Sequence, residues 1–260
     1  MKLLRVFVPN AVIDKNVMRV VVTTQIAFAL LFWLFSPSAL LPKPEEVLAS
    51  FTDLWEQGLG AELITSFVLN AEAIFFATVV SLLLSYATVM PFFRPVVKFI
   101  GKLRFLSMAG LTFLFTLMTT TGHELKLSLL VFSISVFFVT SMEDVIKTIP
   151  KEMYDLGRVM HMSPWRLVWE VLILGQFDKV FDVIRQNAAM GWMMLTLVEG
   201  IVRSEGGVGT VLLDQNHHFR LSAVFAIQVT ILLLGLLQDR FLEFLKKFCC
   251  PYAFLTVEAQ

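Results

Sequence analysis

Residues 73–90 form the stretch AIFFATVVSLLLSYATVM, in which no side chain carries a charge. The apolar region around it extends over residues 63–90. A helix needs about 20 mostly apolar residues to cross a bilayer whose hydrocarbon core is about 30 Å thick, because each residue rises about 1.5 Å. The stretch therefore predicts a helix that spans a membrane.

The composition of the whole chain agrees with a membrane protein. Hydrophobic residues make up 57% of the 260 positions and charged residues 16%, whereas ordinary globular proteins contain roughly 45–50% and about 25%. Such a chain cannot cover itself with polar surface, which argues against a soluble domain, a disordered chain and a nucleic-acid-binding protein. The only cysteines, Cys249 and Cys250, are adjacent and offer no disulfide framework. We expect an all-α integral membrane protein.

Six segments have the length and apolar character of a membrane span, and we treat residues 1–260 as one transmembrane domain. The predicted spans are residues 17–35, 63–90, 105–121, 125–142, 183–202 and 221–237. The fifth is the least apolar, because Arg185, Gln186 and Asn187 lie near its start.

The positions of lysine and arginine predict the direction of the chain, because these residues accumulate in cytoplasmic loops. If residues 1–16 are cytoplasmic and the sides alternate, all but four of the 21 lysines and arginines fall on the cytoplasmic side. The four exceptions are Lys43, Lys126, Arg203 and Arg220. Both termini, including the tail 238–260, are therefore expected in the cytoplasm.

The predicted outer segment, residues 36–62, contains apolar residues at helical spacing. These residues are Val47, Leu48, Phe51 and Leu54. Their spacing predicts an amphipathic helix, which we expect to lie on the membrane surface.

The predicted cytoplasmic loop at residues 143–182 is longer than most connections between helices. A helix is expected to start after Pro150, with one polar side and one apolar side. The polar side holds Lys151, Glu152, Asp155 and Arg158, and the apolar side holds Met153, Leu156, Gly157 and Met160.

A second helix is expected in the same loop, beyond a turn at His161-Met162. Ser163-Pro164 has the form of an N-cap followed by the proline favoured at the first helical position. Two interpretations stay open: the helix pair packs against the protein's own inner face, or its apolar stripe inserts into a cytoplasmic partner.

The spacing in this loop resembles that of ATP-binding cassette (ABC) importer permeases. Their motif is Glu-Ala-Ala, three residues, Gly, nine residues, Ile, one residue and Leu-Pro. Here Asp155-Leu156-Gly157 takes the Glu-Ala-Ala positions, His161 the Gly position, Val171 the Ile position and Ile173-Leu174 the Leu-Pro positions.

Other segments resemble the nitrate/sulfonate/bicarbonate branch of these permeases, and the likeness covers about residues 20–245 in one consistent order. They are Leu41-Pro42-Lys43-Pro44 with Val47-Leu48, Arg185, Gly191-Trp192, Val198-Glu199, Gly207-Val208-Gly209 and Asp239-Arg240.

The resemblance implies the permease subunit of an importer in a bacterial cytoplasmic (inner) membrane. It further implies an ATPase subunit, a second permease copy, expected to form a homodimer, and an extracytoplasmic solute-binding protein. The loop would couple to the ATPase and the spans would form the solute pathway. The residues expected to couple are Glu152, Met153, Asp155, Leu156, Gly157, Met160, His161 and Trp165.

The chain itself is not expected to be an enzyme. A phosphate-binding loop needs Gly-Lys followed by Ser or Thr. The nearest candidate, Gly101-Lys102, is followed by leucine, so the sequence shows no such loop. No cofactor is therefore expected in this chain, and the partner ATPase would bind ATP and magnesium. No catalytic constellation is present, and the pair His217-His218 is not expected to form a metal site.

This chain departs from the family motif at Leu156, His161 and Leu174. The family glycine is expected to end a helix in the left-handed conformation, which costs a residue with a β-carbon roughly 1 kcal/mol. Histidine tolerates that conformation better than most residues, so the turn is still expected to form at His161.

Polar residues within the spans are candidates for the solute path, because such residues are costly in lipid and usually face inward. The candidates are Asn70, Glu72, Thr120, Gln186, Asn187 and Glu199. For Glu72 two placements stay open, one well inside the membrane and one near the outer interface.

Two other function classes require sequence features of their own. An ATP-independent secondary transporter or channel subunit would be expected to show related halves or inverted repeats, which the sequence lacks. A membrane enzyme would need clustered catalytic residues at one depth, and none can be assembled.

Overall fold

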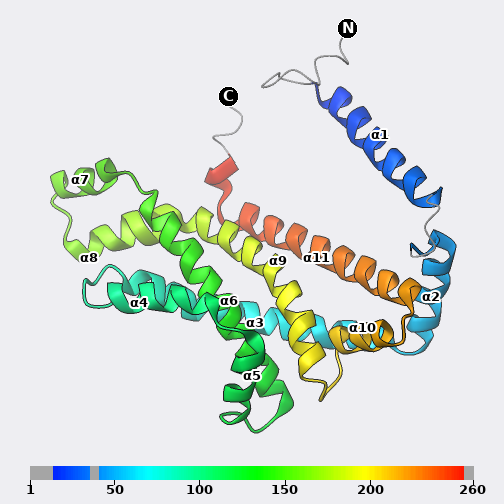
Figure 1. Ribbon diagram of the computed structural model, residues 1–260. Coiled ribbons are helices and arrows are strands. Elements are labelled where there is room, and N and C mark those ends of the chain that lie inside the picture. The colour runs from blue at the N-terminus through cyan, green and yellow to red at the C-terminus, as the bar shows by residue number, and fades with distance from the viewer. Residues whose placement is uncertain (1–13, 36–40, 255–260) are drawn as a thin grey trace.

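The computed structural model describes residues 14–35 and 41–254, and the regular secondary structure of these residues is entirely helical (Figure 1). The elements are α1 Lys15–Leu34, α2 Pro44–Glu56, α3 Leu59–Ala87, α4 Arg94–Lys102, η2 Leu103–Phe105, α5 Met108–Thr116, α6 Gly122–Lys147, α7 Lys151–Val159, α8 Pro164–Leu167, η3 Val168–Ile173, η4 Leu174–Gln176, α9 Phe177–Ile201, α10 Val208–His217, α11 Leu221–Cys249 and η5 Pro251–Phe254. The all-α class is thus confirmed. Most of the predicted N-terminal segment and the last residues of the tail lie outside the described residues.

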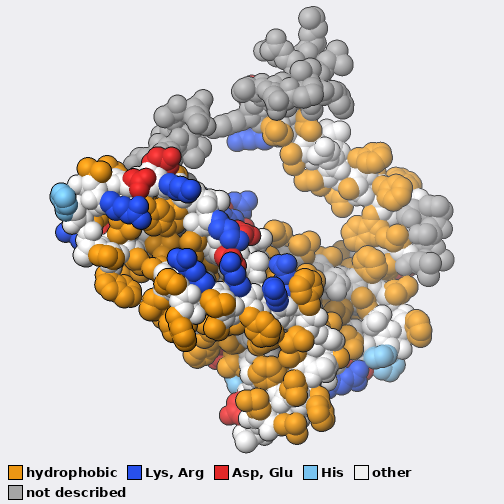
Figure 2. Space-filling model, turned by 60° about the vertical axis from the view of Figure 1, so that its left-hand side comes forward, with side chains coloured by type: hydrophobic (Ala, Val, Ile, Leu, Met, Phe, Trp, Pro, Cys, Tyr) orange, Lys and Arg blue, Asp and Glu red, His pale blue; other side chains and the backbone are white. Residues whose placement is uncertain are grey.

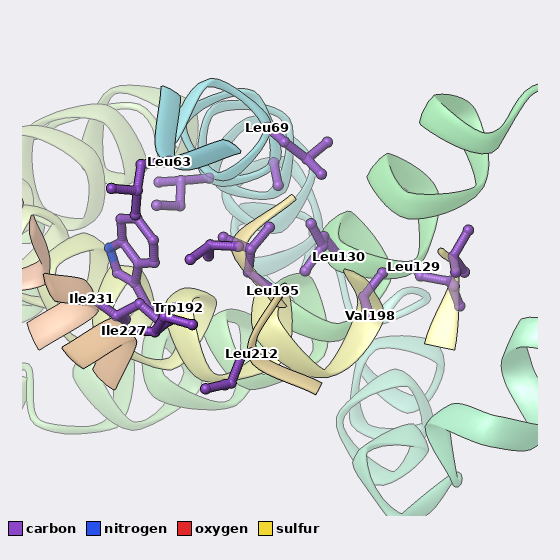
Figure 3. Packing of buried hydrophobic residues seen from close by; sticks show 14 of the residues in the cluster. Leu63, Leu69, Leu129, Leu130, Trp192, Leu195, Val198, Leu212, Ile227 and Ile231 are labelled. Atoms are coloured by element: carbon purple, nitrogen blue, oxygen red, sulfur yellow. The ribbon is translucent and has the colours of Figure 1, made fainter. Parts of the chain in front are cut away.

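The core lies where α3, α6, α9 and α11 meet, with α10 packed at one end. Leu129 and Leu130 of α6, Leu195 of α9 and Ile227 of α11 have no exposed surface. Figure 3 shows these side chains converging from separate helices. Other large apolar side chains point outward, such as Phe75 of α3, which is 64% exposed. Outward apolar faces on long helices suit a lipid surrounding.

Among the described residues, four helices are long and apolar enough to cross a membrane, namely α1 over Asn16–Leu34, α3, α6 and α11. The pair Arg94–Phe105 and Met108–Thr116, bent by 110°, would make a fifth. The predicted spans at 17–35, 63–90, 125–142 and 221–237 fall on the four straight helices. The count of six spans and the direction of the chain stay predictions.

The third predicted span, residues 105–121, is not one straight helix in the structure. Helix α5 covers only the nine residues Met108–Thr116, which rise about 14 Å and would cross about half of a bilayer core. The chain bends before it because Leu106 is extended, with ψ 137°. A sum of hydropathies over a window does not register such a bend, so the apolar run suggested a continuous helix.

The fifth predicted span, residues 183–202, lies within α9, which begins earlier at Phe177. Helix α9 is not among the helices that are apolar enough on their own. Its polar first turns instead pair with α11. The Arg185 guanidinium donates two hydrogen bonds of 2.8 Å to Asp239, and Lys246 Nζ lies 2.7 Å from Asp182.

The amphipathic helix expected on the membrane surface is α2, and part of its apolar side packs against protein. Val47 and Leu54 are buried in the core, and Phe51 packs against it. Ser50 donates a 2.8 Å hydrogen bond to Ser222 of α11. The periodicity correctly predicted the helix, and Leu48 on the same helix is 66% exposed. The placement of this helix on the membrane surface stays a prediction.

The bundle has two ends. We call them the elbow end, after residues 151–167, and the α10 end. At the elbow end, Tyr86 of α3 and Ile146 of α6 pack with Tyr154 of α7. At the α10 end lie the first turns of α3 and α6, where Lys126 of α6 donates to Gly206 O before α10. The long helices run between these two ends (Figure 1).

Candidate functional site: the elbow between α6 and α9

The elbow, defined as residues 151–167, begins with α7. Pro150 precedes the helix in an extended conformation, with ψ 141°. Glu152 lies in the first turn and Arg158 in the last, where an acid and a base each complement the helix dipole. Arg158 also pairs with Asp155 at 3.2 Å. The predicted start of this helix after Pro150 is confirmed.

One side of α7 packs against the bundle and holds the elbow in place. Tyr154 packs with the cluster of Ile149, Val171 and Leu172, and burial raises the pKa of its phenol. Gly157 is buried, and a β-carbon there would lie 2.5 Å from Leu167 Cδ1 of α8. The absence of a side chain at Gly157 therefore lets α7 and α8 pack closely.

The turn between the two helices is a Schellman motif. His161 is left-handed, with φ 54°, as its position in the motif predicted. The Met162 N–H donates to Gly157 O at 3.0 Å and the His161 N–H donates to Arg158 O at 3.0 Å, which is the pair of bonds that closes this motif.

The second helix begins where Ser163-Pro164 predicted. Ser163 Oγ accepts a 3.4 Å hydrogen bond from the Arg166 N–H, and Pro164 occupies the first turn. Helix α8 is followed directly by the π-helical segment η3, the 3₁₀ segment η4 and α9, and Gln176 before α9 departs from helical dihedral angles with φ −117° and ψ 13°. The elbow is thus joined to α9 by consecutive helical segments.

The other side of the elbow is apolar and uncovered. Leu156 is 58% exposed, Val159 76%, Met160 61% and Trp165 69%. Of the eight residues predicted to couple, Glu152, Met153, Asp155, Leu156, Met160, His161 and Trp165 are exposed, and only Gly157 is buried. Sequence reasoning missed Val159 and Trp169, which are also exposed. Val159 lies three positions after Leu156, so helical spacing would have found it.

Of the path candidates, Asn70 of α3 contacts α11, whereas Gln186 and Asn187 lie on α9 outside the groove between α9 and α11. Asn70 donates a 3.1 Å hydrogen bond to Gln238 Oε1, which also accepts from Trp192 Nε1 at 2.6 Å. A groove of about 520 Å³ on this side is lined by Trp192, Gln238 and the Arg185–Asp239 pair. Asn187 is buried and bonds the Val183 carbonyl, whereas Gln186 is exposed.

Glu72 of α3 and Thr120 each contact a residue in the first turn of α6. Glu72 is 3.2 Å from His123, and Thr120 Oγ1 donates to Glu124 at 2.9 Å. Glu124 also forms a capping box with Thr121 at the start of α6. Both placements of Glu72 relative to the membrane stay open.

Glu199, the last path candidate, has no exposed surface. It accepts hydrogen bonds from Ser66 Oγ at 2.6 Å and from the Gly209 N–H at 2.8 Å. A β-carbon at Gly207, whose φ is 106°, would lie 2.3 Å from the Glu199 carboxylate. Glu199 of α9 thus links α3 and the glycine-rich start of α10 through hydrogen bonds.

No family model matches the chain. Two curated proteins of Synechocystis sp. are similar to it. The bicarbonate transport system permease protein CmpB is 24% identical over 126 residues, which is 46% of this chain and 45% of that protein. The nitrate import permease protein NrtB is 22% identical over 126 residues, 46% of each chain.

The chain is homologous to these permeases. The matched region spans less than half the length of either relative. The expected resemblance to importer permeases is thereby confirmed, and it agrees with the apolar helices of the fold.

Proposed function

We propose that this chain is the membrane-spanning permease subunit of an ABC importer in a bacterial inner membrane. In this proposal the bundle forms the solute path and the elbow contacts a separate ATPase subunit. Homology to two transport permeases supports the general role. The exposed elbow supports the coupling role.

The observation that carries the coupling proposal is the division of α7 into two sides. Tyr154 and Gly157 hold the helix against the bundle, while Leu156, Val159 and Met160 stay exposed. Burying apolar surface is favourable by about 25 cal/mol per Å², so these side chains gain most from a protein partner. The self-packed alternative does not account for three exposed apolar side chains within five positions.

The helical run from Pro164 to Ile201 gives the elbow a mechanical connection. Closure of the ATPase would push on α7 and α8, and α8 would carry this displacement to α9. Because α9 lines the groove with Trp192, its movement would change the shape of the proposed path.

Three further components belong to this proposal. They are a second permease copy, expected to make a homodimer, an extracytoplasmic solute-binding protein and the lipid bilayer. The relatives are named for bicarbonate and nitrate, so these two small anions are the first solutes to test in transport assays.

The test compares Met160→Asp with Met118→Asp. Both methionines are strongly exposed, but Met160 is on the elbow and Met118 lies just after α5, near the start of α6. A carboxylate at Met160 would have to be buried against the ATPase without a partner, which costs several kcal/mol. We expect Met160→Asp to reduce co-purification of the ATPase encoded with this chain at least 100-fold and Met118→Asp to leave it unchanged.

Transport completes the test. In proteoliposomes, uptake should require both the ATPase and ATP, and Met160→Asp should abolish it while the purified variant keeps its elution volume. Retention of the ATPase by both variants would place the contact elsewhere. Uptake by this chain alone under an ion gradient would support the ATP-independent transporter instead.

A further inference from the structure

A second cavity lies behind the elbow, on the side opposite its exposed apolar residues. It has a volume of about 550 Å³ and is bounded by α4, the ends of α3 and α6, and the inner side of α7 and α8. Its floor is apolar, formed by Val89, Val97, Ile146, Leu167 and Leu172. The cavity shares no lining residue with the groove between α9 and α11.

The rim of this cavity is mainly basic. Arg94, Lys98, Lys147 and Arg158 line it, with Glu143 as the only acidic lining residue. Figure 2 shows basic side chains gathered among hydrophobic ones on this face of the molecule.

Two of these four positive charges are already compensated. Lys147 lies 3.1 Å from Glu143 and 3.4 Å from Asp144, and Arg158 pairs with Asp155.

The other two rim charges, Arg94 and Lys98, come from α4. Within the described residues neither has a carboxylate within 4 Å. Arg94 Nε donates to the Thr88 carbonyl at 3.0 Å, and its remaining N–H groups have no partner among the described residues. An occupant of the cavity with one or two negative charges would complement these two residues.

Helix α4 has the character of a helix at a membrane surface. Val97 is buried against the bundle, whereas Phe92, Val96 and Phe99 are exposed. Basic residues beside exposed aromatic and aliphatic ones are typical of helices that lie in the headgroup region. The occupant is therefore one that has both a negative headgroup and an apolar part.

We propose that the cavity between α4 and the elbow binds an anionic phospholipid of the surrounding bilayer. Its phosphate would lie between Arg94 and Lys98, and part of an acyl chain would lie on the apolar floor. Basic pockets between membrane helices on the cytoplasmic side are known to bind such headgroups. Because Tyr154, Arg158 and Met162 also line the cavity, the lipid would bridge α4 and the elbow.

The test measures lipid retained by the full-length purified chain. Native mass spectrometry would compare phosphatidylglycerol with zwitterionic phosphatidylcholine for the unaltered chain, Lys98→Gln, and Arg94→Gln with Lys98→Gln. The control is Lys102→Gln, which removes a charge from α4 outside the cavity lining. At about 1 kcal/mol per basic residue, we expect roughly 5-fold weaker phosphatidylglycerol binding for the single variant and roughly 30-fold for the double variant.

Equal weakening by Lys102→Gln, or equal binding of phosphatidylcholine, would overturn the proposal in favour of general surface attraction. Inorganic phosphate serves as a separate probe: if it displaces the lipid at equal concentration, the site belongs to a soluble anion.

A measurement without substitutions covers the case in which a variant does not fold. Photoactivatable phosphatidylglycerol should label peptides that contain Val89 or Leu172 in the unaltered chain. Label confined to the outward faces of α1 and α11 would refute the site. None of these outcomes requires an ATPase, so they are independent of the proposed coupling function.

Discussion

Glu199 provides a test that separates a structural role from a place on the solute path. Its two carboxylate oxygens accept from different donors, Oε1 from Ser66 Oγ and Oε2 from the Gly209 N–H. Ser66 Oγ in turn accepts from the Val208 N–H at 2.8 Å. The change Glu199→Gln keeps the size of the side chain but replaces one acceptor oxygen with an NH₂ group, so one donor loses its partner.

The size of the effect follows from these two bonds. Losing a hydrogen bond to a charged group costs about 1.5–3 kcal/mol, and leaving a buried donor unsatisfied costs about 1–3 kcal/mol. With no exposed surface at Glu199, water cannot compensate. We expect a loss of about 3 kcal/mol in the free energy of unfolding, which at 2–4 °C per kcal/mol lowers the melting temperature by roughly 10 °C.

The assay is thermal unfolding of the purified chain in detergent, followed by size-exclusion chromatography of the heated samples. Glu205→Gln is the matched control, because Glu205 is an exposed glutamate in the same turn. Only Glu199→Gln should melt early. If both variants melt with the unaltered chain and Glu199→Gln alone changes solute uptake, the structural reasoning fails and Glu199 belongs to the path.

Two further substitutions test the elbow and the contact of α9 with α11. His161→Gly should relieve the left-handed backbone at φ 54° and slow proteolysis of the elbow by about 5-fold, from roughly 1 kcal/mol, whereas His161→Val should speed it; no difference between them would contradict a strained turn. For the Arg185–Asp239 pair, with its two bonds of 2.8 Å, Arg185→Asp and Asp239→Arg should each lower the melting temperature. The double exchange should restore most of the loss, with a coupling energy of about 1 kcal/mol in a double-mutant cycle; additive losses would show that the pair contributes nothing.

The sequence predicted best what is encoded within a few neighbouring residues. The Ser163-Pro164 helix start and the left-handed turn at His161 both formed where expected, because caps and turns depend on local backbone hydrogen bonds. The long spans at α3, α6 and α11 were also predictable, because their apolar length alone sets them apart.

Features that depend on which helix packs beside another were not predictable in the same way. Helix α2 packs on α11 through part of its apolar side, and no periodicity encodes which neighbour it meets. Glu199 was a path candidate because it is a carboxylate in a span, but its partners Ser66 and Gly209 come from α3 and α10. Lys126 was one of four basic residues that the charge pattern left on the outer side, and its burial to 2% exposure and its 2.8 Å bond to Gly206 O depend on a neighbouring segment.

The two attachments of the elbow constrain how a force on it would act. Helix α7 rests on the ends of α3 and α6 through Tyr154, while α8 continues into α9. Leu167 of α8 packs closely on Gly157 of α7, where a β-carbon would lie 2.5 Å from Leu167 Cδ1. A push that moves α7 and α8 together therefore displaces α9 against α3 and α6, whereas a push that separates them is absorbed at Gly157. A residue larger than glycine at position 157 should weaken coupling even where the exposed stripe still binds its partner, so binding and transport become separable at this one position.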